Sequence, residues 1–280
     1  MSVRKIYYSL PPQLRFTARR LLYWPLDLFE GITKRRSKYE PPKGLIYTGR
    51  GSGSFLQQGQ QQLGLLKRHL EISPKDKLLD IGSGIGRTAI ALTGFLDQEG
   101  KYEGFDVVKM GVDWCKSKIK PDFPNFNFTY VPLQNDLYNS SDGTAENFQF
   151  PYSENTFDKA FLFSVFTHMQ VSEIQHYLQE IQRVLKPGGS CLATFFVYDK
   201  KTEEQIAFHQ EFKFPFSGEG YRIMDNKVKS ANIAFETTFL DSMITQAGLQ
   251  KLKYIEGYWK DDQEKSEEND FQDIVVMRKP

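Results

Sequence analysis

The sequence predicts an α/β domain built on a mostly parallel sheet, because short apolar runs alternate with helical patterns from about residue 56 to residue 191. Such alternation is typical of parallel βαβ units with right-handed crossovers. A second observation concerns two later strand-like runs, 252–259 and 271–279, which follow one another with no helix between them. Strands joined without a crossover helix pair antiparallel, so an antiparallel hairpin is expected to close the sheet.

The spacing of apolar residues defines the individual elements. Helices are expected at 62–70, 87–96, 112–119, 172–185 and 238–249. Strands are expected at 77–81, 102–107, 126–133, 157–165, 190–197, 252–259 and 271–279. The helix over 172–185 carries its apolar residues on one face, and Lys-Pro-Gly-Gly at 186–189 ends it. Between the fifth strand and the last helix lies a polar and aromatic insertion, 198–237.

Composition excludes several classes of protein. A net charge of +1 over 280 residues gives no reason to expect a nucleic-acid partner. The two cysteines, Cys115 and Cys191, fit a reduced compartment better than a disulfide framework. No N-terminal run resembles a signal peptide, and no segment approaches the roughly 18 apolar residues of a transmembrane helix. A cytoplasmic protein without a metal site is therefore expected.

A glycine-rich turn after the first strand is the clearest functional signal. In LLDIGSGIGRTA, residues 78–89, the segment from Gly84 to Ala89 satisfies the dinucleotide fingerprint G-x-G-x-x-G/A, and Asp106 lies about 20 residues further on. A dinucleotide also needs a second mononucleotide half, which an antiparallel hairpin does not provide. Asp80 would moreover place a carboxylate beside the ligand, which suits a cation better than a pyrophosphate.

These features together favour one cofactor. Gly82, Gly84 and Gly86 allow the backbone to approach a ligand closely, because any Cβ would obstruct it. Asp106, at the end of the second strand, can accept hydrogen bonds from both hydroxyls of a ribose. A ligand with a ribose and a cationic end, but without a diphosphate, is S-adenosylmethionine, whose product is S-adenosylhomocysteine.

Four motifs in order carry a resemblance to a known family. LLDIGSGIGR, GFDV, FDKAFLFSVFTHM and EIQRVLKPGG resemble, in order and spacing, the motifs of class I S-adenosylmethionine-dependent methyltransferases. The narrower resemblance is to bacterial small-molecule methyltransferases of types 11 and 12 that carry "SVFTHM". The resemblance covers residues 56–279 and implies a Rossmann-like, seven-stranded sheet with helices on both faces and an antiparallel C-terminal hairpin.

The resemblance also implies a set of cofactor-binding residues. They are Asp80, Gly82, Ser83, Gly84, Gly86, Asp106, Val107, Gln134, Asn135, Ser164 and Phe166. Asp106 would hold the ribose and Val107 would contact the adenine, while Ser164 and Phe166 would flank the methyl-bearing sulfur. Many relatives carry an acid after the third strand that binds the adenine amino group, but Pro132 stands at that position here. Gln134 or Asn135 could replace it through a side-chain carbonyl.

The candidate catalytic residue is His168, which follows the fourth strand. A neutral imidazole there could take a proton from the acceptor near pH 7, or the ring could simply pack at the start of the next helix. In this family the insertion after the fifth strand commonly builds the acceptor pocket, so 198–237 is expected to cover it. The candidate acceptor-binding residues are Tyr221, Arg222 and His209.

The N-terminal extension, residues 1–55, is basic and helical in pattern. In QLRFTARRLLYW, residues 13–24, the leucines share one helical face and the arginines lie largely off it, and Pro25 is expected to start a second short segment. A basic amphipathic helix can lie on an anionic membrane, so 13–36 could make a peripheral membrane contact. The alternative is a helix that packs over the cofactor site as a lid.

The function expected from these observations is methyl transfer from S-adenosylmethionine to a small-molecule acceptor. The resemblance favours the hydroxyl of a sugar or glycan-related molecule as the acceptor. The alternatives are a methyltransferase acting on a lipid, a quinone or a protein, and a protein that binds the cofactor without turnover. The sequence predicts no particular oligomeric state.

Overall fold

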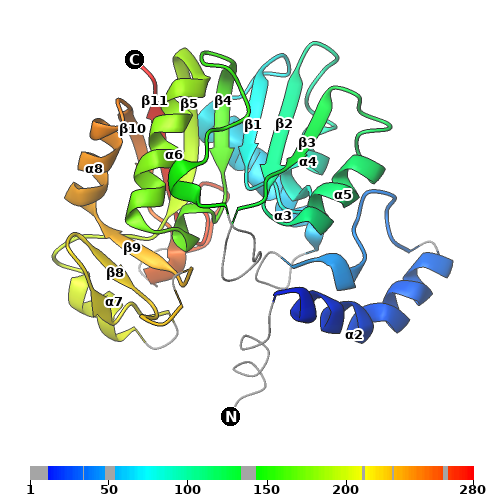
Figure 1. The fold of residues 1–280 in the computed structure, drawn as a ribbon, viewed down its shortest axis with the longest axis horizontal. Coiled ribbons are helices and arrows are strands. Elements are labelled where there is room, and N and C mark those ends of the chain that lie inside the picture. Colours follow the sequence, from blue (N-terminus) through cyan, green and yellow to red (C-terminus); the bar gives the residue numbers. More distant parts are fainter. Residues whose placement is uncertain are drawn as a thin grey trace.

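Seven strands form the main sheet of the protein, in the order β10-β11-β5-β4-β1-β2-β3 (Figure 1). The computed structural model describes residues 12–33, 35–47, 54–133, 143–209, 212–228, 230–260 and 264–280. The strands are β1 (Lys77–Ile81), β2 (Lys101–Asp106), β3 (Phe126–Tyr130), β4 (Phe157–Leu162), β5 (Leu185–Phe195), β10 (Gln250–Ile255) and β11 (Asp273–Arg278). Strand β11 pairs antiparallel with both β10 and β5, and the remaining pairs are parallel. The predicted Rossmann-like sheet with its antiparallel hairpin is confirmed.

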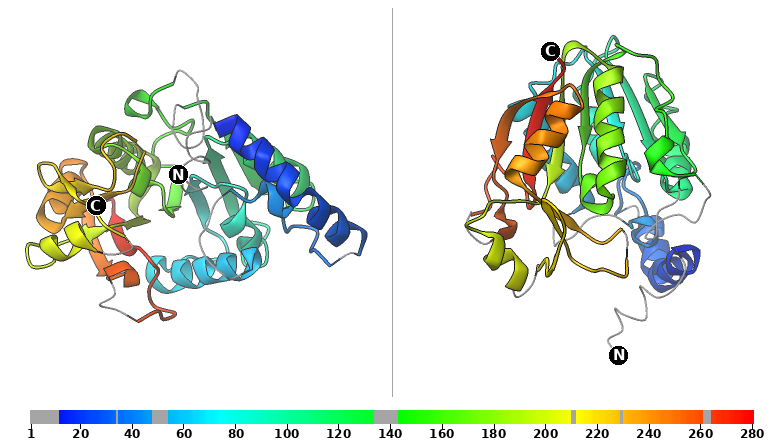
Figure 2. Two further views of the ribbon diagram at one scale, coloured as in Figure 1. Left: turned by 90° about the horizontal axis from the view of Figure 1, so that it is seen from below. Right: turned by 60° about the vertical axis from the view of Figure 1, so that its left-hand side comes forward.

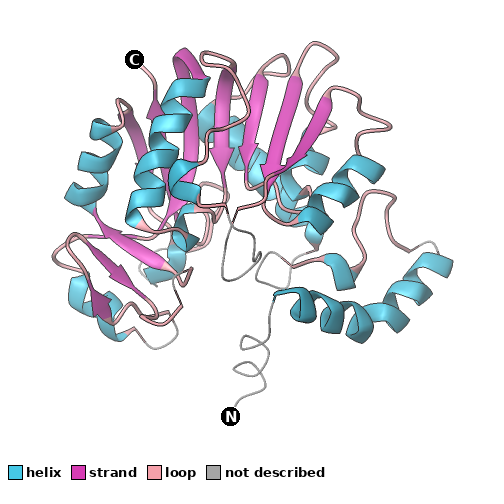
Figure 3. Ribbon diagram, in the orientation of Figure 1, coloured by secondary structure: helices cyan, strands magenta, loops and turns pink. Residues whose placement is uncertain are grey.

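Helices cover both faces of this sheet (Figure 3). One face carries α3 (Phe55–Leu65), α4 (Arg87–Leu92) and α5 (Lys109–Lys118), and the other carries α6 (Val171–Val184) and α8 (Thr237–Gln246). Successive strand residues point to opposite faces of the sheet. Leu78 therefore packs into the apolar core under α3, α4 and α5, and Leu79 packs into the core under α6 and α8. A short π-helix, Leu66–Leu70, continues α3, so this helical segment starts before the predicted 62–70.

The insertion after β5 folds into a second, smaller sheet. Its strands are β6 (Val197–Tyr198), β7 (Phe216–Ser217), β8 (Tyr221–Ile223) and β9 (Ile233–Glu236), in the order β6-β9-β8-β7, and α7 (Glu203–Phe208) lies in the same insertion. Aromatic rings of Phe196, Phe212, Phe214 and Trp259 form its core. The sequence predicts none of the strands of this sheet, because segments of two to four residues are too short to show a period.

A fully buried carboxylate joins the two sheets. Asp273, the first residue of β11, accepts hydrogen bonds from the backbone amides of Val197 (2.7 Å) and Gly257 (2.9 Å). It also accepts from Nε1 of Trp259 (2.7 Å) and from the hydroxyl of Tyr254 (3.1 Å). One side chain thus satisfies four donors from three segments of the chain, which fixes the small sheet against the main one.

Helix α2 (Pro12–Ile32) precedes the α/β domain. The predicted break at Pro25 is wrong, because the helix continues through this residue. Pro25 is exposed, so the carbonyl that loses its partner can bond to water instead. Two views place α2 and the small sheet at the edge where the parallel strands end (Figures 1 and 2). Among the described residues, no helix has the length and apolarity needed to span a membrane.

Candidate active site

The glycine-rich turn leaves β1 in a conformation that favours glycine. Gly82, Gly84 and Gly86 have φ angles of 77°, 59° and 80°, in the left-handed region. A Cβ on Gly82 would lie 2.4 Å from Cγ2 of Val165, and one on Gly86 would lie 2.7 Å from Sγ of Cys115. The turn therefore needs glycine both for its backbone angles and for the close packing around it.

Asp106 lies at the end of β2 and holds this turn. Its Oδ2 accepts a hydrogen bond from the amide of Gly84 (2.7 Å), and its Oδ1 accepts from the amide of Val108 (2.7 Å). A carboxylate has about four lone-pair positions, so each oxygen keeps capacity for a ribose hydroxyl. The sequence does not reveal the contact between Asp106 and Gly84, because it joins residues far apart in the chain through the neighbouring strands β1 and β2.

Asp80 and Ser83 supply further polar groups beside the turn. Tyr102 donates a hydrogen bond from its hydroxyl to Oδ2 of Asp80 (2.6 Å), and both side chains are buried. Among the described residues, the hydroxyl of Ser83 is buried and has no hydrogen-bond partner. A buried hydroxyl without a partner is costly unless a ligand satisfies it, so these residues fit a polar cofactor such as S-adenosylmethionine.

The end of β4 brings Ser164 to the surface and keeps Phe166 inside. Ser164 has a φ angle of 58°, donates its amide to Oγ1 of Thr194 (2.7 Å) and its hydroxyl to Oε1 of Gln272 (2.9 Å). Phe166 is fully buried, and its ring lies 5.1 Å from that of Phe195. The ring of Phe166 therefore belongs to the core, and the predicted place of this residue beside the methyl-bearing sulfur stays a prediction.

His168 lies in a short 3₁₀ turn, Phe166–His168, and contacts the insertion. Its Nδ1 is 3.0 Å from the backbone oxygen of Ser230. Since a carbonyl only accepts, Nδ1 carries the proton and Nε2 keeps its lone pair in the neutral ring. Burial lowers the pKa of His168 below its usual 6.5, so the ring is neutral at pH 7. This is the protonation state that a general base requires.

The three predicted acceptor-binding residues have different surroundings. Arg222 donates Nε to the backbone oxygen of Phe214 (2.8 Å) and pairs through Nη1 with Glu203 (2.9 Å), so its guanidinium braces the insertion and the predicted acceptor contact is not supported. Nδ1 of His209 accepts a hydrogen bond from the amide of Phe212 (3.0 Å). Tyr221 lines a cavity.

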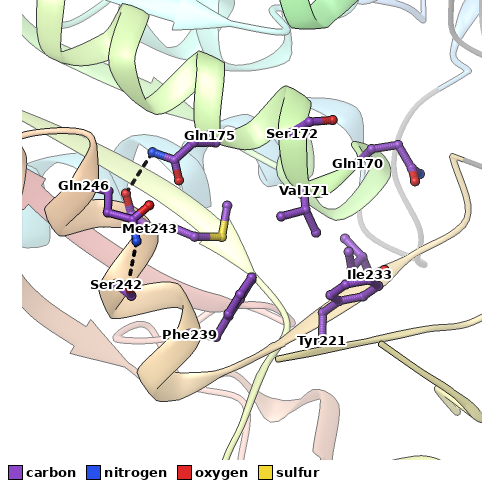
Figure 4. Close-up of a pocket in the computed structure, with 10 residues that line it drawn as sticks. All are labelled: Gln170, Val171, Ser172, Gln175, Tyr221, Ile233, Phe239, Ser242, Met243 and Gln246. Carbon is purple, nitrogen blue, oxygen red and sulfur yellow. Dashed lines mark hydrogen bonds between the residues drawn. The ribbon is translucent and has the colours of Figure 1, made fainter. Parts of the chain in front are cut away.

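The cavity that Tyr221 lines has a volume of about 560 Å³ and lies between α6, α8 and the small sheet (Figure 4). Its walls are Gln170, Val171, Ser172, Gln175, Tyr221, Ile233, Phe239, Ser242, Met243 and Gln246. These residues offer amides, hydroxyls and two aromatic rings, and none of them is charged. Sequence reasoning missed the glutamines and serines, because polar residues on amphipathic helices resemble an ordinary solvated surface.

The residues predicted to contact the adenine are Val107 and either Gln134 or Asn135. Val107 is half-buried and packs against the core on the α6 face. Gln134 and Asn135 lie outside the described residues. In the N-terminal extension, the ring of Phe16 on α2 lies 5.5 Å from that of Tyr47, and the hydroxyl of Tyr47 is 2.3 Å from where a Cβ on Gly111 would lie. The extension therefore reaches the α5 end of the site through Tyr47.

Comparisons with known proteins show what this chain resembles. Residues 79–193 match the family described as "Methyltransferase domain". A demethylmenaquinone methyltransferase of Lysinibacillus sphaericus is 25% identical over 67% of this chain and 75% of its own length. One from Bacillus cereus is 30% identical, but the match covers only 45% of this chain and 48% of that relative.

Solved structures share the fold. The PH0226 protein of Pyrococcus horikoshii has a TM-score of 0.56 at 16% identity, covering 84% of this chain and 94% of that one. A SAM-dependent methyltransferase of Methanosarcina mazei has a TM-score of 0.51 at 18% identity, covering 76% and 96%. The family match identifies residues 79–193 as a methyltransferase domain, and the fold and the relatives support a class I S-adenosylmethionine-dependent methyltransferase. Among the described residues, no group of side chains could hold a metal ion.

Removing the carboxylate of Asp106 should weaken cofactor binding. Asp106→Ala deletes the predicted acceptor for the ribose and removes the acceptor of the Gly84 amide, so affinity for S-adenosylhomocysteine should fall at least roughly tenfold. Calorimetric titration measures this directly. Asp113→Ala is the matched control, because that exposed carboxylate on α5 pairs with Lys109 (2.7 Å) and should leave affinity unchanged. Unchanged affinity in folded Asp106→Ala would exclude Asp106 from the site.

Cofactor affinity should also rise with pH. Burial raises the pKa of Asp106 to about 6 and that of Asp80 to about 7. The folded protein therefore holds protons that the unfolded chain has released above about pH 4, and its free energy of unfolding should fall between pH 4 and 7. Ionised carboxylates accept hydrogen bonds best, so affinity for S-adenosylhomocysteine should rise by up to about tenfold per pH unit below each pKa. A titration series that gives a flat profile would contradict this.

Proposed function

We propose that this methyltransferase acts on an uncharged small molecule that carries a hydroxyl, with a sugar or glycan-related acceptor as the first candidate. The observation that carries the proposal is the position of His168, a neutral imidazole between the end of β4 and the insertion. Two residues further on, Gln170 begins the wall of a cavity lined by amides, hydroxyls and rings. Such a lining suits a neutral, hydroxylated ligand.

Each part of the chain has a task in this proposal. S-adenosylmethionine supplies an already activated methyl group when it is bound. The glycine-rich turn and Asp106 hold and orient the cofactor, and alignment of donor and acceptor provides much of the rate. His168 takes the acceptor's proton, and the small sheet excludes water from the acceptor.

A quinone is the second candidate, and the curated relatives favour it. The Lysinibacillus and Bacillus proteins are named demethylmenaquinone methyltransferases. A reduced quinone also carries ring hydroxyls, so a neutral base at His168 would serve it as well. Tyr221 and Phe239 provide ring surfaces in the cavity against which a flat aromatic acceptor could pack.

An assay with fractionated extracts tests the proposal. Purified protein and methyl-labelled S-adenosylmethionine are incubated separately with a water-soluble sugar fraction, a quinone-containing lipid fraction and a protein fraction. Label in the sugar fraction, absent with Asp106→Ala, supports the first candidate, and label in the quinone fraction supports the second. Label only in protein, or no S-adenosylhomocysteine with any fraction while calorimetric binding is intact, would overturn the proposal.

A further inference from the structure

Helix α2 turns its polar face toward the protein. The carboxylate of Asp27 accepts hydrogen bonds from the backbone amides of Lys43 (2.6 Å) and Gly44 (2.9 Å). Nζ of Lys43 pairs with Glu30 (2.5 Å), and Nε of Arg19 donates to the backbone oxygen of Lys43 (3.3 Å). Helix α2 is thus fixed to the 3₁₀ turn Lys43–Leu45 largely by polar contacts, whereas a surface helix ordinarily buries its apolar face.

The apolar face of α2 points outward instead. The large apolar residues exposed on this helix are Leu14, Leu21, Leu22, Trp24, Leu26, Leu28, Phe29 and Ile32. Leu21, Leu22 and Ile32 are each more than 70% exposed, and Trp24 is 63% exposed. At 3.6 residues per turn, positions seven apart fall on one line, so these side chains form a continuous stripe rather than scattered single residues. A contiguous exposed apolar surface of this kind marks an interaction site.

The charges around the stripe indicate what covers it. Both acidic residues of α2, Asp27 and Glu30, contact the segment at Lys43 and so lie on the inner side. Arg20 is exposed in the first half of the helix, and Arg35 is exposed just beyond its end. The outer side therefore combines apolar side chains, a tryptophan and flanking cations, which is the pattern that binds an anionic lipid surface.

We propose that α2 lies in the surface of an anionic bilayer, with its leucine stripe and Trp24 inserted among the lipids and the flanking arginines at the headgroups. Helix α2 lies at the edge where the parallel strands end, so docking would place that edge close to the membrane (Figures 1 and 2). The proposal goes beyond the proposed function, since it holds for either acceptor.

Vesicle co-sedimentation with the whole 280-residue chain tests the proposal. Wild type should bind vesicles of phosphatidylglycerol mixed with phosphatidylcholine, and binding should weaken with salt and with phosphatidylcholine alone. Leu21→Glu/Ile32→Glu should lower partitioning into the anionic vesicles at least about tenfold. Phe208→Glu is the matched control, because Phe208 on α7 is 83% exposed and should leave partitioning unchanged.

Two further measurements make the outcome decisive. Calorimetric titration with S-adenosylhomocysteine should give the same affinity for the double variant as for wild type, which shows that the fold and the cofactor site are intact. Analytical ultracentrifugation reports whether the stripe joins two copies of the chain. No binding of wild type to anionic vesicles overturns the proposal, and so does a dimer that the double variant dissociates.

Discussion

His168→Ala should lower turnover about 10²–10⁴-fold, the usual contribution of a positioned general base. Affinity for S-adenosylhomocysteine should hardly change, because the ring is needed only for the acceptor's proton. His176→Ala is the matched control: His176 lies on α6, and its Nε2 is 2.9 Å from the backbone oxygen of Phe148. This variant removes a histidine with a similar backbone contact and should keep near-normal turnover.

The pH profile separates a base from a packed ring. Burial lowers the pKa of His168, so kcat of wild type should rise with pH at values below about 6.5 and then level off. Saturating cofactor must be used, so that Asp80 and Asp106 do not contribute through binding. If His168→Ala instead loses cofactor binding and thermal stability together, the contact with Ser230 is structural and His168 is not the base.

Asp273→Ala should cause the largest loss of stability, about 3–5 kcal/mol in the free energy of unfolding. It would leave two buried backbone amides and a buried indole N–H without their acceptor, and it would remove the acceptor of the Tyr254 hydroxyl. Lys260, whose Nζ lies 4.0 Å from the carboxylate, would also lose a nearby opposite charge. Urea denaturation monitored by fluorescence measures the change.

The control for Asp273 is a carboxylate of the same type at the surface. Asp241 on α8 pairs with Lys251 and is 40% exposed, so Asp241→Ala should cost at most about 1 kcal/mol. A comparable loss of unfolding free energy in both variants would mean that the buried hydrogen bonds of Asp273 stabilise the fold no more than a surface ion pair does. Asp273→Asn keeps the volume of the side chain but turns an NH₂ group toward donors, so it should also destabilise strongly.

Much of the main sheet was predictable, because its information is periodic and local. The alternation between residues 56 and 191 and the two final strands predicted the parallel sheet and its antiparallel hairpin. The small sheet was not predicted, since its strands are two to four residues long and depend on aromatic packing from Phe196 and Trp259. The predicted break at Pro25 was also wrong, because a helix tolerates proline where water can bond to the carbonyl that loses its partner.

The sequence predicted the proximity of the glycine-rich turn and Asp106, but it did not predict the directions of several other side chains. The glycine-rich turn and Asp106 lie together as the motif order implies. Phe166 and Arg222 illustrate what spacing cannot show: one ring packs inward against Phe195, and one guanidinium is held by the backbone of its own insertion. Whether a residue faces a ligand or a neighbour depends on tertiary contacts that no local pattern records.

The central place of β11 in the sheet has a consequence for how the chain folds during synthesis. This strand follows every other strand in sequence, yet it lies between β5 and β10, and β10 joins the sheet through β11. Its first residue, Asp273, also completes the junction with the small sheet. Until residues 273–278 have been synthesised, β10 has no partner strand, and the four groups that donate hydrogen bonds to Asp273 lack this acceptor. Native closure of the main sheet and its junction with the small sheet therefore follow the synthesis of β11, and chains stalled before this strand should be substrates for chaperones.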